Sequence, residues 1–365
     1  MADSNEIKNY INDQLTFNLA DDFHDWLDEQ GYGVFLRKPD ATEVPIEIAK
    51  ALFHSDRAIY SELKEQYEAD MRSRILRLED YPANLGQYEA LLGSMKNKAM
   101  VLPFVGAGLS VAAGCPTWSD YIIQQAVDAG FDEVTVKNRL NDGEQEEVMD
   151  EVIVRRTVEV FRRDFSSSFT GRRLSPNLSP ARCFPGLFDG PAITTNFDRI
   201  LEECLSNAGH PFDEKVTGTE ESARFIRGVH CGERYLLKLH GNIDEPAHRV
   251  LTKHEYDRAY GENGLDYTKR LPKIIRQVFS SYSVVFLGCS LVADRYLDVL
   301  ESLFVEQGEY MPKHFAILEA PEDEDDLRQR DSFLAGRGVS PIWYSRGDYE
   351  AVTDILGLLK LEKAI

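Results

Sequence analysis

The stretch VLPFVGAGLSVAAGCPTW, from Val101 to Trp118, determines how we interpret the rest of the chain. It opens with an apolar run, which is typical of a strand that is buried on both faces of a parallel sheet. Gly106, Gly108 and Ser110 follow this run at once. Glycines just past a strand let the backbone approach a ligand closely because they have no Cβ atom. Phosphate is the usual ligand of such a turn.

The turn matches neither of the familiar phosphate-binding motifs that end strands in this way. The P-loop closes with Gly-Lys-Ser/Thr, whereas no lysine follows Gly108 here. The dinucleotide motif G-x-G-x-x-G would need a glycine where Val111 stands. Taken alone, the turn therefore indicates either a phosphate site or a tight strand-to-helix turn without a ligand.

The composition is that of a globular protein. The chain has 365 residues and is 43% hydrophobic, enough for one large domain or two ordinary ones. Its formal net charge is -21. We therefore do not expect most of its surface to bind nucleic acid directly, because such binding needs a basic face. The N-terminus has no apolar signal region, and no stretch approaches the roughly 18 apolar residues of a spanning helix. We expect a cytoplasmic protein without a membrane segment.

The cysteines argue against a disulfide framework and against a zinc site. The chain has 5 of them, scattered and never in C-x-x-C spacing: Cys115, Cys183, Cys204, Cys231 and Cys289. The motif H-E-x-x-H is absent from the sequence as well. We therefore interpret the cysteines as buried thiols and expect no metal.

We interpret residues 1 to 97 as a helical N-terminal region that serves oligomerisation or regulation. Apolar residues recur there every four positions, as on one ridge of a long helix: Ile59, Leu63, Tyr67, Met71 and Ile75. The Pro/Gly stretch from Tyr81 to Gly86 separates this helix from the next one. The ridge indicates either a surface that pairs subunits of a homo-oligomer and so controls activity, or a cover for the chain's own sheet.

Residues 98 to 365 alternate between strand-like and helix-like patterns. We expect strands near 100 to 105 and 191 to 195, and in the runs ERYLLKLHG, SVVFLGCS, KHFAILEA and SPIWYS. We expect helices near 117 to 129 and 144 to 164, from Asp198 to about Ser206, and at the C-terminal end. The pattern predicts an α/β fold: a Rossmann-like parallel sheet with helices on both faces, plus a helical insertion at about residues 130 to 185.

Polar motifs follow the strands at the edge of the sheet where open parallel sheets bind ligands. They are GAGLS at 106–110, TTNFD at 194–198, KLHG at 238–241 and GCSLVAD at 288–294. Asn196 and Asp198 could simply cap a helix, and a lone histidine such as His240 is often structural. With an ordinary pKa of about 6.5, however, a histidine can act as a general base near neutral pH. The repetition of such turns favours a nucleotide site.

The order of these motifs resembles that of the sirtuin-like family, whose members bind NAD in an α/β fold. The resemblance covers roughly residues 97 to 346 and includes the P-T-W that follows the glycine turn. It implies a pyrophosphate site at Gly106, Ala107, Gly108 and Ser110. It implies that Asn196 and Asp198 face the nicotinamide ribose, that His240 is the base, and that Gly288 and Ser290 meet the adenosine half. Residues in or beside these motifs would also contact NAD: Thr117, Trp118, Thr195 and Asp294.

Several departures distinguish this chain from the deacylating sirtuins. Those enzymes carry a four-cysteine zinc module after the catalytic histidine, whereas only Cys289 follows His240 here. The asparagine motif reads TTNFD instead of T-Q-N-I-D, and a long helical insertion precedes it. In these respects the chain resembles the bacterial sirtuin-like effectors that hydrolyse NAD in antiphage defence.

This resemblance implies an NAD hydrolase that yields nicotinamide and ADP-ribose or a cyclic form. Asn196 would position water or ribose, His240 would assist as general base, and Asp198 would give electrostatic support. The partner would be a HerA-like ATPase, a short Argonaute or a phage trigger protein. The alternative is a non-catalytic NAD- or ADP-ribose-binding regulatory subunit of a defence complex.

One segment is rich in arginine although the chain as a whole is acidic. Its residues are Arg155, Arg156, Arg162, Arg163, Arg172, Arg173 and Arg182. They indicate either a solvated face that is paired with local carboxylates, or a lid or partner contact beside the site.

Overall fold

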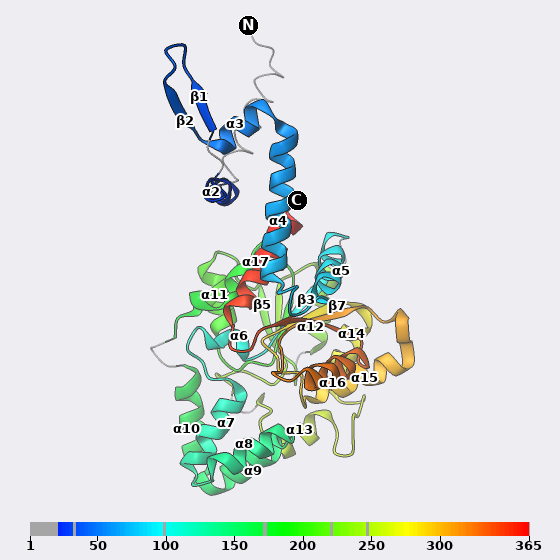
Figure 1. The fold of residues 1–365 in the computed structure, drawn as a ribbon. Helices are drawn as coiled ribbons and strands as arrows, with labels where there is room; N and C mark the ends of the chain where they lie inside the picture. Colours follow the sequence, from blue (N-terminus) through cyan, green and yellow to red (C-terminus); the bar gives the residue numbers. More distant parts are fainter. Residues whose placement is uncertain are drawn as a thin grey trace. The chain divides into compact units, whose positions relative to one another are not determined.

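The computed structural model describes residues 21–31, 34–97, 100–170, 174–219, 222–245 and 248–364. The chain divides into two compact units, Met1–Ile75 and Leu76–Ile365 (Figure 1). The helix α5 (Asn84–Lys96), which we assigned to an N-terminal region ending at residue 97, belongs to the second unit. The functional division between the regions stays a prediction.

The first unit combines helices with a β-hairpin. Its helices are α2 (Asp21–Glu29), α3 (Ile48–Ser55) and α4 (Arg57–Ile75). Strands β1 (Val34–Arg37) and β2 (Glu43–Ile46) pair antiparallel. The region is helical as predicted, but its hairpin was not predicted, because strands of four residues are too short to show a clear alternating pattern.

The apolar ridge on α4 contributes only partly to the core of the first unit. Leu63 and Tyr67 pack against a buried cluster that includes Phe23, Phe53 and Tyr60. By contrast, the side chain of Ile59 is 45% exposed. Part of the ridge therefore covers the unit's own core.

The second unit is built on a seven-stranded sheet in which every strand pair is parallel. The strand order is β5-β6-β4-β3-β7-β8-β9. The strands are β3 (Val101–Val105), β4 (Ala192–Thr194), β5 (Glu214–Thr217), β6 (Tyr235–Lys238), β7 (Ser283–Leu287), β8 (His314–Glu319) and β9 (Val339–Tyr344). This confirms the Rossmann-like α/β fold. The edge strand β5 was not predicted, since its sequence EKVT is short and half polar.

Helices cover both faces of this sheet. They are α11 (Ile200–Asn207), α12 (Ser222–Cys231), α13 (Lys253–Tyr260), α14 (Arg270–Ser281), α15 (Arg295–Gln307), α16 (Glu324–Ala335) and α17 (Glu350–Lys363), together with α5. The helix α14 packs against α12 and α15, whereas α17 packs against α5. In the sheet's core the ring centre of Phe104 lies 5.0 Å from the ring centre of Phe286 and 4.9 Å from the ring centre of Tyr296. The apolar runs of β3 and β7 thus follow from burial on both faces.

A buried asparagine attaches α5 to the outer edge of the sheet. The side chain of Asn84 is 0% exposed. Its Nδ2 donates to the carbonyls of Trp343 and Leu76, each at 2.8 Å. Its Oδ1 accepts from the Trp343 N–H at 2.8 Å. The amide group therefore pairs with β9 as the backbone of a neighbouring strand would.

Helices α7 to α10 form a subdomain between β3 and β4. Their bounds are α7 (Trp118–Asp128), α8 (Glu133–Asn141), α9 (Gln145–Arg156) and α10 (Val158–Phe169). Their core is rich in aromatic rings, and Figure 1 shows these helices close to α13. The single helix expected over 144 to 164 is instead broken at Thr157, whose φ is 65°. This conformation is costly for a β-branched residue, so the break could not be predicted from the residue type at this position.

The arginines of this subdomain are engaged in part with local carboxylates and rings. The Arg156 guanidinium donates to Asp164 at 2.6 Å, and Arg155 lies 3.9 Å from the ring centre of Phe131. Arg163 donates to Asp164 as well. Arg172 and Arg173 lie outside the described residues.

Candidate functional site

A cavity of about 740 Å³ opens at the carboxyl ends of the central strands. The strand order changes direction at β3, because the chain adds β4 on one side and β7 on the other, and such a switch point is where open parallel sheets bind ligands. The predicted site residues that line the cavity are Gly106, Ala107, Gly108, Thr117, Trp118, Thr195, Asn196, Asp198, His240, Gly288, Ser290 and Asp294. Ser110 lies behind this wall, 2% exposed.

The glycines of the first turn allow two loops to interlock. The N–H of Gly106 donates to Leu287 O and that of Gly108 to Gly288 O, both at 2.9 Å. A Cβ on Gly106 would lie 2.5 Å from Gly288 O, and a Cβ on Gly288 would lie 2.3 Å from Leu109 N. Gly288 also has a φ of +68°. The close contact between the turns after β3 and β7 is thus a sufficient reason for glycine at these positions, even when no ligand is bound.

Most amides of the GAGLS turn are already used within the protein. The N–H groups of Leu109 and Ser110 donate to the carbonyls of Gly106 and Ala107. Within the described chain, no acceptor engages the Ala107 N–H, and Ala107 lines the cavity. A pyrophosphate here would therefore contact the Ala107 amide and nearby side chains, so a full backbone cradle is not formed by this turn.

Asn196 lies at the centre of the site with one polar atom unsatisfied. Its Nδ2 donates to Gly106 O at 3.0 Å and to Ser110 Oγ at 3.2 Å. Because the carbonyl of Gly106 can only accept, the amide orientation is fixed by this contact. The Oδ1 is buried and has no partner among the described residues, although the side chain is 7% exposed and lines the cavity.

Asp198 has a structural role as well as a place in the wall. Its Oδ1 accepts from Ser110 Oγ at 3.2 Å and from Ile200 N, the first N–H of α11, at 2.8 Å, whereas the N-cap residue of this helix is Arg199. Burial raises the pKa of this carboxyl, and the positive charge of Lys238 opposes that rise. The Lys238 ammonium donates to Asp198 O at 2.6 Å and to Glu202 Oε1 at 2.9 Å. The side chain of Asp198 is 3% exposed, and the role of this residue toward a ligand stays a prediction.

His240 is held between two tyrosines. A hydrogen bond of 2.8 Å joins its Nε2 to Tyr260 OH, and one of 3.3 Å joins its Nδ1 to Tyr256 OH. Burial lowers the pKa of His240 from 6.5 to about 3. The imidazole is therefore neutral near pH 7, and the ordinary pKa expected from the sequence was wrong for this buried residue. Tyr256 lines the cavity beside it.

Asp294 and a neighbouring ion pair form the wall below the turn after β7. Asp294 Oδ2 accepts from Tyr296 OH at 2.8 Å, and burial raises the pKa of Asp294 to about 6. The Arg295 Nε donates to Glu146 Oε1 at 2.9 Å, and its Nη2 donates to Asp257 at 2.7 Å. Glu146 on α9 lines the cavity, so this pair joins the helical subdomain to the sheet. The sequence did not identify Glu146.

Thr117 and Trp118 begin α7 at the rim of the cavity. Thr117 Oγ1 accepts from Asp120 N at 3.0 Å and is the N-cap of the helix. The ring of Trp118 stacks on Tyr121 with centres 5.7 Å apart. Thr195 N donates to Val105 O at 3.2 Å, which keeps the start of the TTNFD turn close to β3.

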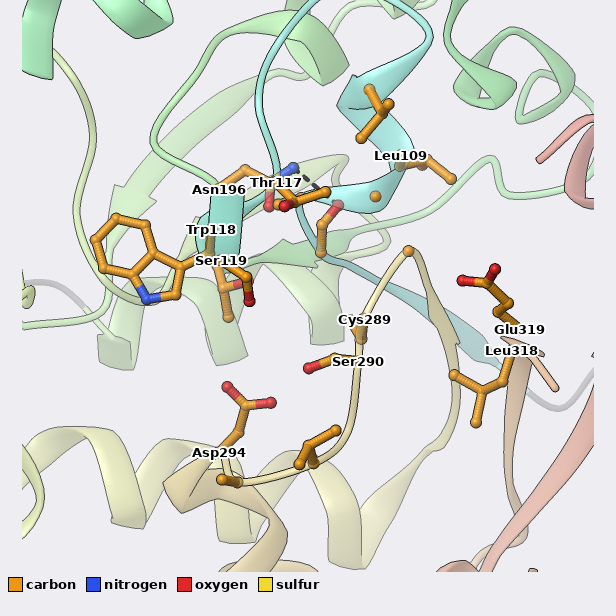
Figure 2. A pocket seen from close by; sticks show the side chains of 18 of the residues that line it. Leu109, Thr117, Trp118, Ser119, Asn196, Cys289, Ser290, Asp294, Leu318 and Glu319 are labelled. Carbon is orange, nitrogen blue, oxygen red and sulfur yellow. Dashed lines mark hydrogen bonds between the residues drawn. The ribbon is translucent and has the colours of Figure 1, made fainter. Parts of the chain in front are cut away.

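The cavity extends to β8 and β9, whose residues were not among the predicted site residues. Glu319 ends β8 and accepts from Gly347 N at 2.7 Å through Oε1. Figure 2 shows Leu318 and Glu319 across the pocket from Asn196 and Trp118, with Ser290 between them. Glu319 directly follows the apolar run of its strand. It could therefore have been predicted, because open parallel sheets bind ligands at the carboxyl ends of their strands.

The described residues contain no group of three or more His, Cys, Asp or Glu side chains that could hold a metal ion. In the same part of the chain, no helix is long and apolar enough to cross a bilayer.

Comparison with known proteins supports the sirtuin-like resemblance. A family model described as SIR2-like domain matches residues 191–342. This range contains Asn196, His240 and Gly288, whereas the GAGLS turn precedes it. No curated protein is detectably similar to the chain. Residues 191–342 are thus similar to the SIR2-like family, whose members are NAD-dependent enzymes.

Proposed function

We propose that the chain is an NAD glycohydrolase that uses the cavity at the β3 switch point. The observation that carries the proposal is the convergence of Asn196, His240 and Asp294 on one cavity of about 740 Å³. Pockets for small molecules and cofactors span about 300 to 1,000 Å³. The match to the SIR2-like domain favours NAD as the molecule bound.

The unsatisfied oxygen of Asn196 fits a ribose or a water molecule. A buried acceptor without a partner costs about 1 to 3 kcal/mol, and a ligand hydroxyl that donates to it removes that cost. Because Nδ2 is fixed by Gly106 O and Ser110 Oγ, the acceptor is held in place before the ligand binds. The neutral amide can orient water without adding charge.

The reaction is the hydrolysis of the bond between nicotinamide nitrogen and ribose C1′. The electron pair of that bond leaves with nicotinamide, and the oxygen of a water molecule bonds to C1′. The products are nicotinamide, ADP-ribose and one proton. Asn196 would position the water or the ribose, and the buried charge of Asp198 would support the positive character that develops on the ring.

His240 is unprotonated before reaction and can accept the released proton. Burial lowers the pKa of His240 and makes it a weak base, so it would hold the proton only briefly. Tyr256 OH lies 3.3 Å from Nδ1 and lines the cavity, which offers a route for that proton back to solvent. The engagement of both imidazole nitrogens by tyrosines also favours the alternative of a non-catalytic NAD- or ADP-ribose-binding subunit.

We further propose that NAD depletion by this chain acts in bacterial antiphage defence, in the cytoplasm and as a homo-oligomer. This rests on the resemblance in motif order and on the lack of the four-cysteine module. A HerA-like ATPase, a short Argonaute or a phage protein would supply the trigger. An enzyme that consumes NAD must be held inactive in an uninfected cell, which motivates a gating partner.

The test is nicotinamide release from NAD by the full chain, alone and with candidate partners. Asn196→Ala and His240→Ala should each reduce release by at least about 10²-fold. Asn207→Ala and His230→Ala, at exposed positions, are the matched controls and should leave release unchanged.

The outcomes separate the two functions. Wild-type turnover by both site variants would refute the proposed site. NAD binding without nicotinamide release under any condition, lost in Asn196→Ala, would replace the hydrolase by the binding subunit. Thermal unfolding of each variant shows whether the fold is kept.

A further inference from the structure

A chain of hydrogen bonds runs from a buried tyrosine through His240 to the wall of the cavity. Tyr260 OH lies 2.8 Å from His240 Nε2, and Tyr256 OH lies 3.3 Å from His240 Nδ1. Tyr256 lines the cavity, whereas the side chain of Tyr260 is only 1% exposed. The hydrogens of this chain can all be donated toward the cavity or all be donated away from it.

The burial of Tyr260 determines this direction. Among the described residues, His240 Nε2 is the single hydrogen-bond partner of Tyr260 OH. The hydroxyl keeps its hydrogen, because burial raises the pKa of Tyr260 above its ordinary value. A buried donor without an acceptor is costly, so Tyr260 donates to Nε2.

The donor at Nε2 fixes the tautomer of His240. A neutral imidazole carries its hydrogen on one nitrogen and accepts at the other. Because Nε2 accepts from Tyr260, the hydrogen of the ring lies on Nδ1 and is donated to Tyr256 OH. In the opposite tautomer Nε2 would donate to Tyr260 OH, and the hydroxyl hydrogen of Tyr260 would have no acceptor among the described residues.

Tyr256 thus acts as an acceptor toward His240, and its own hydroxyl hydrogen is not used by the imidazole. His240 Nδ1 is the single hydrogen-bond partner of Tyr256 OH within the described chain. An acceptor inside the cavity that Tyr256 lines can therefore take this hydrogen. The ring is held in place, because it stacks on the ring of Tyr260 with centres 5.9 Å apart and the Arg295 guanidinium lies 5.4 Å from its ring centre.

Asn196 presents the complementary group in the same cavity. Strands β4 and β6 pair in parallel with Thr194 opposite Lys238, and Asn196 and His240 each follow these residues by two positions. The two residues therefore follow neighbouring strands at the same register. Asn196 Oδ1 is a buried acceptor without a partner among the described residues. The wall of the cavity thus combines an acceptor on Asn196 with a donor on Tyr256.

We propose that Tyr256 contacts the ligand directly and donates its hydroxyl hydrogen to an oxygen of the ribose that Asn196 binds. His240 and Tyr260 are positioning residues for this donor. Adjacent ribose hydroxyls can each donate and accept, so one can donate to Asn196 Oδ1 while the other accepts from Tyr256. The identity of the ligand rests on the proposed function, whereas the direction of the hydrogen bonds does not.

The arrangement also restricts how His240 can take up a proton. Both imidazole nitrogens are occupied, since Nδ1 donates to Tyr256 and Nε2 accepts from Tyr260. A proton can therefore bond to Nε2 only after the hydrogen bond to Tyr260 breaks. It can then leave from Nδ1 through Tyr256, whose oxygen accepts it while the hydroxyl hydrogen passes to the cavity.

Calorimetric titration of the full chain with ADP-ribose and with ADP tests the ligand contact. Tyr256→Phe removes the hydroxyl and keeps the ring, so ADP-ribose should bind roughly three- to tenfold more weakly. The affinity for ADP, which lacks the second ribose, should be the same in this variant and the wild type. Tyr310→Phe is the matched control, because its side chain is 95% exposed, and it should bind both compounds as the wild type does.

NMR of the full chain labelled with ¹⁵N-histidine tests the direction of the hydrogen bonds without a ligand. The signals of His240 are those that His240→Ala removes. The wild type should be protonated at Nδ1 near pH 7. Tyr260→Phe should give a mixture of both tautomers, because the donor to Nε2 is lost. An unchanged tautomer in Tyr260→Phe would show that Tyr260 does not position the ring.

The results that would overturn the proposal differ from those that would refute the hydrolase. A wild-type His240 protonated at Nε2, unchanged ADP-ribose binding in Tyr256→Phe, or an equal loss of affinity for ADP and ADP-ribose would each overturn it. The NMR result holds whether or not Tyr256→Phe folds. ADP-ribose binding that depends on Tyr256, in a chain that never releases nicotinamide, would refute the hydrolase and retain the contact. Absence of ADP-ribose binding to the wild type would refute both.

Discussion

Replacing Gly288 by alanine should damage both the stability and the site, because this residue joins the turns after β3 and β7. Its φ is +68°, and an added Cβ would lie 2.3 Å from Leu109 N and 2.9 Å from Gly108 C. Both neighbours are backbone atoms, so no flexible side chain can move aside. Gly209 offers a matched control, because its φ is +75° and nothing lies within 4 Å of its added Cβ.

The two variants separate the cost of the backbone conformation from the cost of the overlap. A non-glycine residue in the left-handed region costs about 1 to 2 kcal/mol, which applies to both glycines. Forcing extra volume into a packed contact costs about 1 to 3 kcal/mol more, which applies to Gly288 alone. We expect Gly209→Ala to lower the free energy of unfolding by about 1 to 2 kcal/mol, and Gly288→Ala by about 2 to 5 kcal/mol.

Urea unfolding of both variants measures this difference, and NAD cleavage reports on the site. A displacement of about 1 Å in the turn can reduce turnover by about 10²-fold, so Gly288→Ala should lose activity under conditions where it is still folded. Gly209→Ala should retain activity. Equal destabilisation by the two substitutions would refute the close approach of the turns as the reason for Gly288.

Further substitutions test other parts of the second unit. Asn84→Ala leaves three buried backbone groups unpaired and should lower the free energy of unfolding by about 3 to 5 kcal/mol, whereas Asn207→Ala should change it by less than about 0.5 kcal/mol in the same urea titration. Thr157→Gly relieves a φ of 65° and should raise the free energy of unfolding by about 1 kcal/mol; a decrease would contradict strain at this break. The buried His314 has a pKa lowered from 6.5 to about 3, so the unfolded chain binds its proton first and stability should fall as the pH drops through this window. His314→Leu should flatten that pH dependence, and an unchanged profile would show that His314 is not its source.

The central strands could be predicted because burial on both faces leaves continuous apolar runs. Strands β3, β7 and β8 lie within predicted runs, and β9 begins at Val339, one residue before the predicted run SPIWYS. The short strand β5 and the hairpin β1–β2 could not be predicted, since four residues that are partly polar do not differ from a loop in pattern. The break at Thr157 was equally hidden, because neither glycine nor proline marks it.

The expectation that ligands bind at the carboxyl ends of parallel strands identified the main site residues. It could not predict which of them are protonated at neutral pH. Asn196, His240 and Gly288 follow separate strands and line one cavity. The lowered pKa of His240 depends on burial beside Tyr256 and Tyr260, which reach it from α13 by tertiary packing alone. Spacing along the chain contains no information on such contacts.

The pairing of Asn84 with Trp343 limits how copies of this chain could assemble. The outer strand β9 would otherwise offer its free N–H and C=O groups to a strand from another molecule. At Trp343 both groups are already occupied by a side-chain amide, and α5 packs against the same strand. A continuous intermolecular sheet across β9 would have to break these bonds and remove the helix. Subunits of any homo-oligomer must therefore meet through other surfaces, such as helical faces or the opposite edge at β5.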